Sequence, residues 1–301
     1  MPQRNGLPLT HALLALAIMV VWGTNFVVVK VAITHLTPLS LALLRFAFAF
    51  FPLAFFLPRP KVPWRNLAAY GLLIGVGQFG VMFTAMRADI TPGLASLVIQ
   101  MQVFFTIALA MKLSGERLAL FQIVALALAT GGLGVILTHT DGSATPLGLG
   151  LTLFAAMAWA GGNMVAREAA RIDPALNMLA YVVWSALFAV PPLLVLGLLI
   201  EGPQAVAAGL ASADGWTWGA VAWQAIGNTM FGYAAWAWLL GRHPAAQVAP
   251  MALLVPVFGL AASAFVLGEP LQPWKLSAFA LVMAGLALGM LWPHLRSRTA
   301  R

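Results

Sequence analysis

Residues 10–34, THALLALAIMVVWGTNFVVVKVAIT, form an almost unbroken apolar run of the length that crosses a lipid bilayer. A transmembrane helix needs about 20 consecutive apolar residues to span the hydrocarbon core. The run is long for the core of a secretory signal, is not followed by a clear small-residue cleavage site and carries Lys30 near its far end. We therefore expect it to be retained as the first transmembrane helix.

Nine further apolar runs of similar length follow the first one. They occupy residues 38–57, 66–86, 91–112, 118–139, 146–169, 174–200, 215–240, 244–267 and 273–293. A proline opens six of the runs, at a helix position where its missing amide proton costs nothing: Pro38, Pro92, Pro146, Pro174, Pro244 and Pro273. The sequence predicts an all-α membrane protein with ten transmembrane helices.

The overall composition is that of a chain surrounded by lipid. Hydrophobic residues make up 62% of the 301 residues and charged residues 8%, whereas a soluble domain carries about 25% charged residues. The net charge of +8 does not indicate a nucleic-acid partner, because the basic residues are scattered between apolar runs. The absence of cysteine excludes disulfides and thiolate metal sites.

The distribution of lysine and arginine indicates how the chain is oriented. With a cytoplasmic N-terminus, 12 of the 16 Lys and Arg fall in cytoplasmic segments, and only Arg87 and Lys275 fall in external ones. An excess of basic residues on the cytoplasmic side is the rule for multi-pass membrane proteins. We expect a multi-pass inner-membrane protein with both termini in the cytoplasm.

Four short matches recur in the same order along the two halves of the chain. They pair Gly23-Thr24-Asn25 with Gly161-Gly162-Asn163, Pro38 with Pro174, Gly75 and Phe79-Gly80 with Gly227 and Phe231-Gly232, and Gly115-Glu116 with Gly268-Glu269. Each half holds five spans, an odd number, so the second half enters the membrane upside down. The sequence predicts two inverted five-helix repeats, residues 1–141 and 142–301, an architecture common among secondary transporters.

Several of these motifs carry a family resemblance over residues 10–293. They are Trp22-Gly23-Thr24-Asn25-Phe26, Arg45-Phe46, Ser114-Gly115-Glu116, Pro256 and Leu267-Gly268-Glu269-Pro270. The chain resembles EamA-type members of the drug/metabolite transporter superfamily, and among them most the YddG-type exporters of aromatic and other neutral amino acids. One departure is that Gln102-Val103 stands where the second half has Val255-Pro256, so the halves are not equally kinked.

The acidic residues are absent from the interiors of the expected spans. All eight lie in loops or at span ends: Asp89, Glu116, Asp141, Glu168, Asp173, Glu201, Asp214 and Glu269. Proton- or sodium-coupled carriers usually keep a carboxylate inside the membrane. We therefore expect an uncoupled carrier or exchanger of solutes without net charge.

Amide and aromatic side chains do occur inside the spans and are our candidates for substrate binding. They are Trp22, Asn25, Gln78, Phe79, Met82, Gln100, Trp159, Asn163, Gln224, Asn228 and Phe231. Amides donate to a carboxylate and accept from an ammonium, and aromatic rings stack on planar groups, which suits an amino acid. The alternative is structural: intramembrane amides link helices, and Gly beside Asn permits close packing.

Lys30 and Arg45 are the two basic residues inside or at the edge of spans. Snorkelling to the nearby external face explains both. The alternative is that they lie at the cavity mouth and bind a carboxylate there.

The function expected from these features is export of neutral, aromatic or bulky apolar amino acids and related metabolites by alternating access, with the substrate class implied by the resemblance. The chain would act as a monomer in the bilayer. The alternatives are a carrier of other hydrophobic metabolites or drugs, and a non-transporting lipid-binding or scaffold protein. The sequence holds no P-loop, no paired histidines and no nucleophile–base pair, so we expect no catalytic residue, cofactor or metal site.

Overall fold

The computed structural model describes residues 7–114, 120–139, 141–243 and 248–299, and these residues are predominantly helical. Within these ranges the only β-type pairing is an isolated bridge between Ile90 and Ala144. The expected motif Gly115-Glu116 and the expected helix start at Pro244 lie outside the described ranges.

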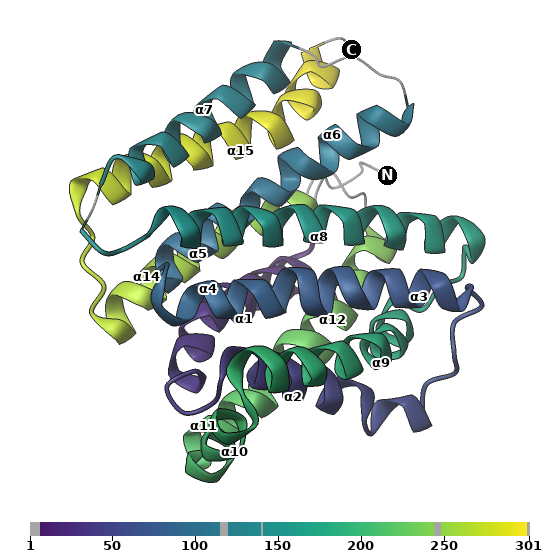
Figure 1. Ribbon diagram of the computed structural model, residues 1–301. Coiled ribbons are helices and arrows are strands. Elements are labelled where there is room, and N and C mark those ends of the chain that lie inside the picture. Colours follow the sequence, from purple (N-terminus) through teal and green to yellow (C-terminus); the bar gives the residue numbers. More distant parts are fainter. Residues whose placement is uncertain (1–6, 115–119, 140, 244–247, 300–301) are drawn as a thin grey trace.

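The first half of the chain forms five helical stretches (Figure 1). They are α1 (Leu9–Ala32); α2 (Pro38–Phe50) with the short η1 (Leu53–Phe55); α3 (Trp64–Gly71), η2 (Leu72–Gly80) and α4 (Val81–Ala88); α5 (Pro92–Val98), η3 (Ile99–Met101) and α6 (Gln102–Ser114); and α7 (Leu120–Leu137).

The second half repeats this order and adds one short helix. Its elements are α8 (Pro146–Ile172); α9 (Met178–Leu196) and η4 (Gly197–Glu201); the extra α10 (Pro203–Ser212); α11 (Gly215–Ala222), η5 (Trp223–Phe231) and α12 (Gly232–Arg242); η6 (Ala249–Leu253) and α14 (Leu254–Leu267); and α15 (Pro273–Thr299).

Seven helical segments among the described residues are long and apolar enough to cross a membrane: Leu9–Ala32, Pro38–Phe55, Trp64–Ala88, Pro92–Leu109, Leu120–Leu137, Pro146–Ile172 and Met178–Glu201. Two shorter apolar helices, Met251–Leu267 and Pro273–Gly289, match the ninth and tenth expected spans. The eighth expected span corresponds to α11, η5 and α12, which follow one another without a break. The chain is thus an all-helical, multi-pass membrane protein.

The helices pack in pairs that join the two halves. Helix α7 lies along α15 at one edge of the molecule, and α2 lies along α9 (Figure 1). Helix α1 packs against α14, and α8 packs against α6. The pair α1–α14 joins the first span of the first half to the fourth span of the second half. The pair α8–α6 joins the first span of the second half to the fourth span of the first half, so the two pairs occupy equivalent places in the two halves.

Both third spans of the halves are interrupted by π-helix. Leu72–Gly80 and Trp223–Phe231 each form a nine-residue π stretch between two α-helices. The fourth spans contain short 3₁₀ stretches, Ile99–Met101 and Ala249–Leu253. Interruptions of this kind are frequent at functional sites. All four stretches face the interior of the helix bundle, where they contribute to one cavity.

A buried polar cluster around Glu269 joins α5, α14 and α15. The Glu269 carboxylate accepts from Thr91 Oγ1 at 2.6 Å, from the Gly93 amide at 3.2 Å, from Lys275 Nζ at 3.1 Å and from Ser263 Oγ. The Glu269 and Lys275 side chains are 5% and 0% exposed. The sequence predicts Glu269 at a span end. In the structure Glu269 also links three helices, α5, α14 and α15, through hydrogen bonds.

Candidate functional site

A cavity of about 620 Å³ lies in the middle of the helix bundle, between the two halves. Its lining comes from α1, the third and fourth spans of both halves, α8, α9 and α15. Every described residue that lines it is uncharged. A volume of this size is typical of sites for small organic molecules.

Nine of the eleven candidate residues line this cavity: Trp22, Asn25, Gln78, Phe79, Met82, Gln100, Trp159, Asn163 and Asn228. The two others do not. Gln224 is fully buried behind the wall, and Phe231 is 39% exposed.

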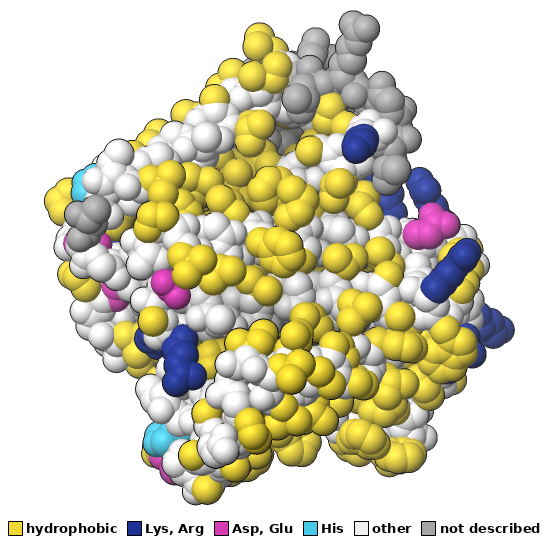
Figure 2. All heavy atoms as spheres, viewed as in Figure 1, with side chains coloured by type: hydrophobic (Ala, Val, Ile, Leu, Met, Phe, Trp, Pro, Cys, Tyr) yellow, Lys and Arg dark blue, Asp and Glu magenta, His cyan; other side chains and the backbone are white. Residues whose placement is uncertain are grey.

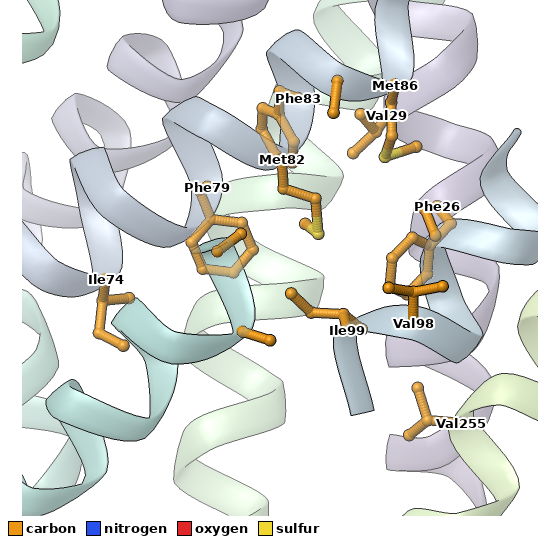
Figure 3. Close-up of a cluster of buried hydrophobic side chains, with 14 of the residues drawn as sticks. Phe26, Val29, Ile74, Phe79, Met82, Phe83, Met86, Val98, Ile99 and Val255 are labelled. Carbon is orange, nitrogen blue, oxygen red and sulfur yellow. The ribbon is translucent and has the colours of Figure 1, made fainter. Parts of the chain in front are cut away.

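The apolar wall brings together side chains from separate spans. Figure 3 shows Phe79 and Met82 on one helix, with Met82 pointing toward Ile99, and Phe26 and Val255 on neighbouring helices. All five residues line the cavity. The flexible thioether of Met82 adapts to ligands of different shape, which suits a site that accepts a range of apolar groups.

Aromatic rings form a second part of the wall. The Trp22 ring lies 5.8 Å from the ring of Tyr233 and 5.6 Å from that of Trp236, measured between centroids. Trp22 Nε1 also donates to the Asn228 carbonyl oxygen at 3.3 Å. The indole is therefore held by α12 and η5, and its remaining face is available to stack on a ligand.

Arg45 lies directly behind the polar part of the wall. Its guanidinium is fully buried and donates from Nη1 to Gln224 Oε1 at 2.6 Å and from Nη2 to Asn228 Oδ1 at 2.9 Å. It also lies 3.7 Å from the centroid of the Phe79 ring. Gln224 Nε2 in turn donates to Asn25 Oδ1 at 2.5 Å. None of the described residues offers Arg45 a carboxylate.

The guanidinium fixes the direction of this hydrogen-bond chain. Arginine only donates, so Gln224 and Asn228 must turn their oxygens toward Arg45. The amide nitrogen of Gln224 then engages the oxygen of Asn25. The side-chain NH₂ groups of Asn25 and Asn228 donate to no other described residue, and both side chains line the cavity. Asn25 and Asn228 therefore present N–H donors to a ligand in the cavity.

A second set of amides lies on α6 and α8. Asn163 Nδ2 donates to Gln102 Oε1 at 3.0 Å and to Thr106 Oγ1 at 3.2 Å.

Gln78, in η2, is 3% exposed, and its Oε1 has no hydrogen-bond partner within the described residues. A buried carbonyl oxygen without a partner is unfavourable, and the Gln78 amide would have to turn toward the cavity to accept from a ligand N–H.

Neither basic candidate is among the residues that line the cavity. Lys30 Nζ donates to the carbonyl oxygens of Met86 and Arg87 at 2.8 and 2.9 Å, where α4 ends and its carbonyls lack helical partners. Arg45 does not snorkel to the surface, because the amide oxygens and the Phe79 ring give its guanidinium partners inside the bundle.

The position of Phe231 differs from the expected one because of the π stretch. The spacing of Gln224, Asn228 and Phe231 predicts one stripe along the eighth span, but only in an α-helix of about 3.6 residues per turn. A turn closed by i→i+5 bonds holds more residues, so each residue rotates less about the axis. Seven residues after Gln224, Phe231 has therefore not returned to the same face, and it is exposed.

Some lining residues were not among the candidates, namely Phe26, Tyr70, Gln102, Tyr233 and Trp236. The chain has three tyrosines, and two of them line the cavity. A phenolic hydroxyl inside an apolar span was a signal that could have identified Tyr70 and Tyr233 from the sequence.

Comparisons with known proteins agree with this architecture. The EamA-like transporter family matches residues 9–138 and again residues 146–291. A protein of Salmonella typhimurium named probable amino-acid metabolite efflux pump is 43% identical, over 96% of this chain and 97% of its own length. A protein of the same name from Escherichia coli K12 is 40% identical, over 93% of this chain and 95% of its own length.

More distant similarity extends over most of the chain. An uncharacterized inner membrane transporter of Escherichia coli K12, YedA, is 26% identical over 97% of this chain and 94% of its own length. A crystal structure that is 19% identical superposes with a TM-score of 0.63 and covers 94% of this chain and 97% of its own. Both halves of the chain match one transporter family, and the relatives match over nearly their full length. These matches indicate a small-molecule transporter of the inner membrane. This chain belongs to the EamA-like transporter family.

Proposed function

We propose that this carrier exports neutral amino acids and related metabolites, with a preference for aromatic and bulky apolar side chains. The proposal rests on one observation: the cavity combines an uncharged apolar and aromatic wall with amide donors whose direction Arg45 fixes. The names of the relatives from Salmonella and Escherichia coli, both probable amino-acid metabolite efflux pumps, support the same substrate class.

Each part of a neutral amino acid has a complementary group in the cavity. The carboxylate suits the NH₂ groups of Asn25 and Asn228, which lie in the positive field of Arg45. The ammonium suits the Gln78 carbonyl oxygen, which has no partner among the described residues. A planar or bulky side chain suits the wall around Trp22 and Phe79.

We further propose that transport needs no ion gradient. A coupling proton or sodium ion usually binds an intramembrane carboxylate, and no described residue of the cavity carries one. The substrate would then move down its own gradient or exchange with another solute.

Alternating access by two inverted halves completes the proposed mechanism. It is supported by the nine-residue π stretches at matching places and by the exchangeable helix pairs α1–α14 and α8–α6. In this mechanism the same cavity opens to one side of the membrane and then to the other, as the halves rock about the ligand.

Uptake by proteoliposomes tests the proposal. Radiolabelled tryptophan, threonine and choline are offered to vesicles that hold the purified protein, with and without imposed pH and sodium gradients. We expect saturable flux of tryptophan and threonine that neither gradient changes. Flux of choline alone would overturn the substrate class, and flux that requires a gradient would overturn the uncoupled mechanism.

A further inference from the structure

A second cavity, of about 610 Å³, lies at the end of the molecule where α3 begins and α8 ends. Its lining comes from the first residues of α3 and the last turns of α8, and it includes Arg65, Arg167, Arg171 and Glu168. In Figure 2 basic side chains gather at this right-hand end of the visible face, with acidic atoms among them.

Most of the positive charge in this cavity is not neutralised. Arg171 Nη1 lies 3.5 Å from Glu168 Oε2, and both side chains are largely exposed, at 68% and 55%. Arg65 and Arg167 form no hydrogen bond or ion pair with any residue that the structure describes. Both guanidinium groups line one cavity and are available to bind an oxyanion there.

Hydrogen bonds through Asn66 join α3, α8 and α9 beside this cavity. Asn66 Nδ2 donates to the Val165 carbonyl oxygen at 3.1 Å, and Tyr181 donates to Asn66 Oδ1 at 2.6 Å. Asn163 lies one helical turn before Arg167 on the same side of α8 but lines the central cavity, so the two cavities adjoin along this helix. No described residue lines both cavities, so the basic cavity is a separate surface site beside the central one.

An apolar face of α8 leads straight to the basic cavity. Phe154 and Met157 are 57% and 42% exposed, and Ile172, which lines the cavity, is 45% exposed. Phe154, Met157 and Glu168 share this face, since they follow one another at helical intervals. At 1.5 Å per residue Met157 lies about 15 Å along the axis from Arg167, which is half of the roughly 30 Å hydrocarbon core.

We propose that this cavity binds the phosphate of an anionic phospholipid, whose acyl chains lie along the exposed face of α8. The excess of arginine favours a phospholipid whose headgroup is neutral apart from its phosphate. A headgroup ammonium would be repelled by the same arginines. The position supports a lipid over a soluble phosphate, since the exposed apolar face extends from the basic cavity as far as Met157, about the depth of one leaflet. Basic pockets between helices on the cytoplasmic side are known places for such headgroups.

Native mass spectrometry of the full chain in detergent tests this site without any transport assay. The protein is titrated with phosphatidylglycerol or with phosphatidylethanolamine of identical acyl chains, and with glycerol phosphate as the soluble anion. We expect phosphatidylglycerol to bind at least about tenfold more tightly than either of the other two. Glycerol phosphate that binds as tightly as the lipid would assign the cavity to a free anion and overturn the proposal.

Matched charge variants locate the binding. In the double variant Arg65→Gln/Arg167→Gln we expect phosphatidylglycerol to bind about tenfold more weakly, and in Arg65→Lys/Arg167→Lys we expect a smaller loss. The control is Arg59→Gln/Arg242→Gln, which removes two arginines that lie over Trp64 and Trp238, at 4.0 and 4.1 Å, and line no part of the cavity. Equal losses in the two glutamine variants would mean that diffuse charge binds the lipid, which contradicts a site between α3 and α8.

Discussion

Arg45 is a fully buried cation inside a membrane protein. A charge in such a place is expensive unless polar groups surround it, and it usually marks a functional site. Two amide oxygens and the face of the Phe79 ring offset part of this cost, while Nε of Arg45 is buried without a hydrogen-bond partner among the described residues. The same contacts turn a chain of neutral amides into a set of donors, so the charge acts on the cavity without lining it.

Replacement of Arg45 tests this role at the scale of one residue. In Arg45→Met the oxygens of Gln224 and Asn228 lose their donor, the amides reorient, and we expect tryptophan transport to fall at least about a hundredfold, since hydrogen bonds to charged groups contribute about 1.5–3 kcal/mol each. Arg45→Lys keeps the charge but not the fork of donors, so we expect an intermediate loss. The measurement is kcat/KM for exchange in liposomes.

A second cation provides the control for this variant. Lys30→Met removes a charge that caps α4 and does not line the cavity, so KM for tryptophan should stay close to that of the unaltered chain. If the Arg45→Met variant elutes as a folded protein and still transports tryptophan at the rate of the unaltered chain, Arg45 has only a structural role.

At the scale of elements, close helix contacts depend on glycine. A Cβ at Gly71 would lie 2.1 Å from the Ser185 carbonyl oxygen, which is backbone of α9 and cannot move aside alone. We expect Gly71→Ala to destabilise the protein by about 1–3 kcal/mol, because α3 and α9 must separate. Thermal unfolding in detergent measures this effect.

Gly150→Ala in α8 is the matched control, since nothing lies within 4 Å of a Cβ there. It should leave stability unchanged or raise it by up to about 1 kcal/mol, because alanine favours the helix. If both variants unfolded at the same temperature, the tight α3–α9 contact would be contradicted.

The cluster around Glu269 supports a second prediction at this scale. Lys275→Met leaves a buried carboxylate with only neutral donors and should destabilise the protein by about 3–5 kcal/mol. The double variant Glu269→Gln/Lys275→Met removes both charges, so it should be more stable than the sum of the two single variants implies. Additive effects in unfolding experiments would mean that the two buried charges do not interact.

The elements also show how far sequence patterns reach. Periodicity located the spans, and the places of Trp22 and Asn163 on their helices were predicted because α1 and α8 are regular. It failed for Phe231, because hydrophobic periodicity contains no sign of a π stretch. Snorkelling was the wrong explanation for Arg45, which is buried, since a sequence does not reveal that amides far away in the chain gather around a guanidinium.

At the scale of the molecule, the proposed halves are alike in shape but not in charge. Counted from Pro38 and Pro174, the counterpart of Arg45 in the second half is Tyr181. Tyr181 is also buried, but it donates to Asn66, away from the central cavity. The electrostatic part of the proposed binding site therefore belongs to one half, and the substrate would bind in one preferred orientation.

The proposed topology of ten spans can be tested with introduced cysteines. The chain has no cysteine of its own, so a single introduced thiol is the only one that can be labelled. Gln204→Cys lies in the expected external segment after the seventh span, and Lys61→Cys lies in the basic segment after the second span. A membrane-impermeant maleimide should label Gln204→Cys in intact cells and Lys61→Cys only after permeabilisation. Labelling of both in intact cells would contradict ten spans with cytoplasmic termini.

The most direct test of the central claim is competition for radiolabelled tryptophan exchange by tryptophan methyl ester. The ester keeps the indole and the amine but has no carboxylate for the amides that Arg45 orients. We predict that unlabelled tryptophan competes at least about tenfold more strongly than the ester, since a lost hydrogen bond to a charged group is worth about 1.5–3 kcal/mol. Equal competition by the two compounds would contradict recognition of the carboxylate and leave the cavity selective for the aromatic group alone.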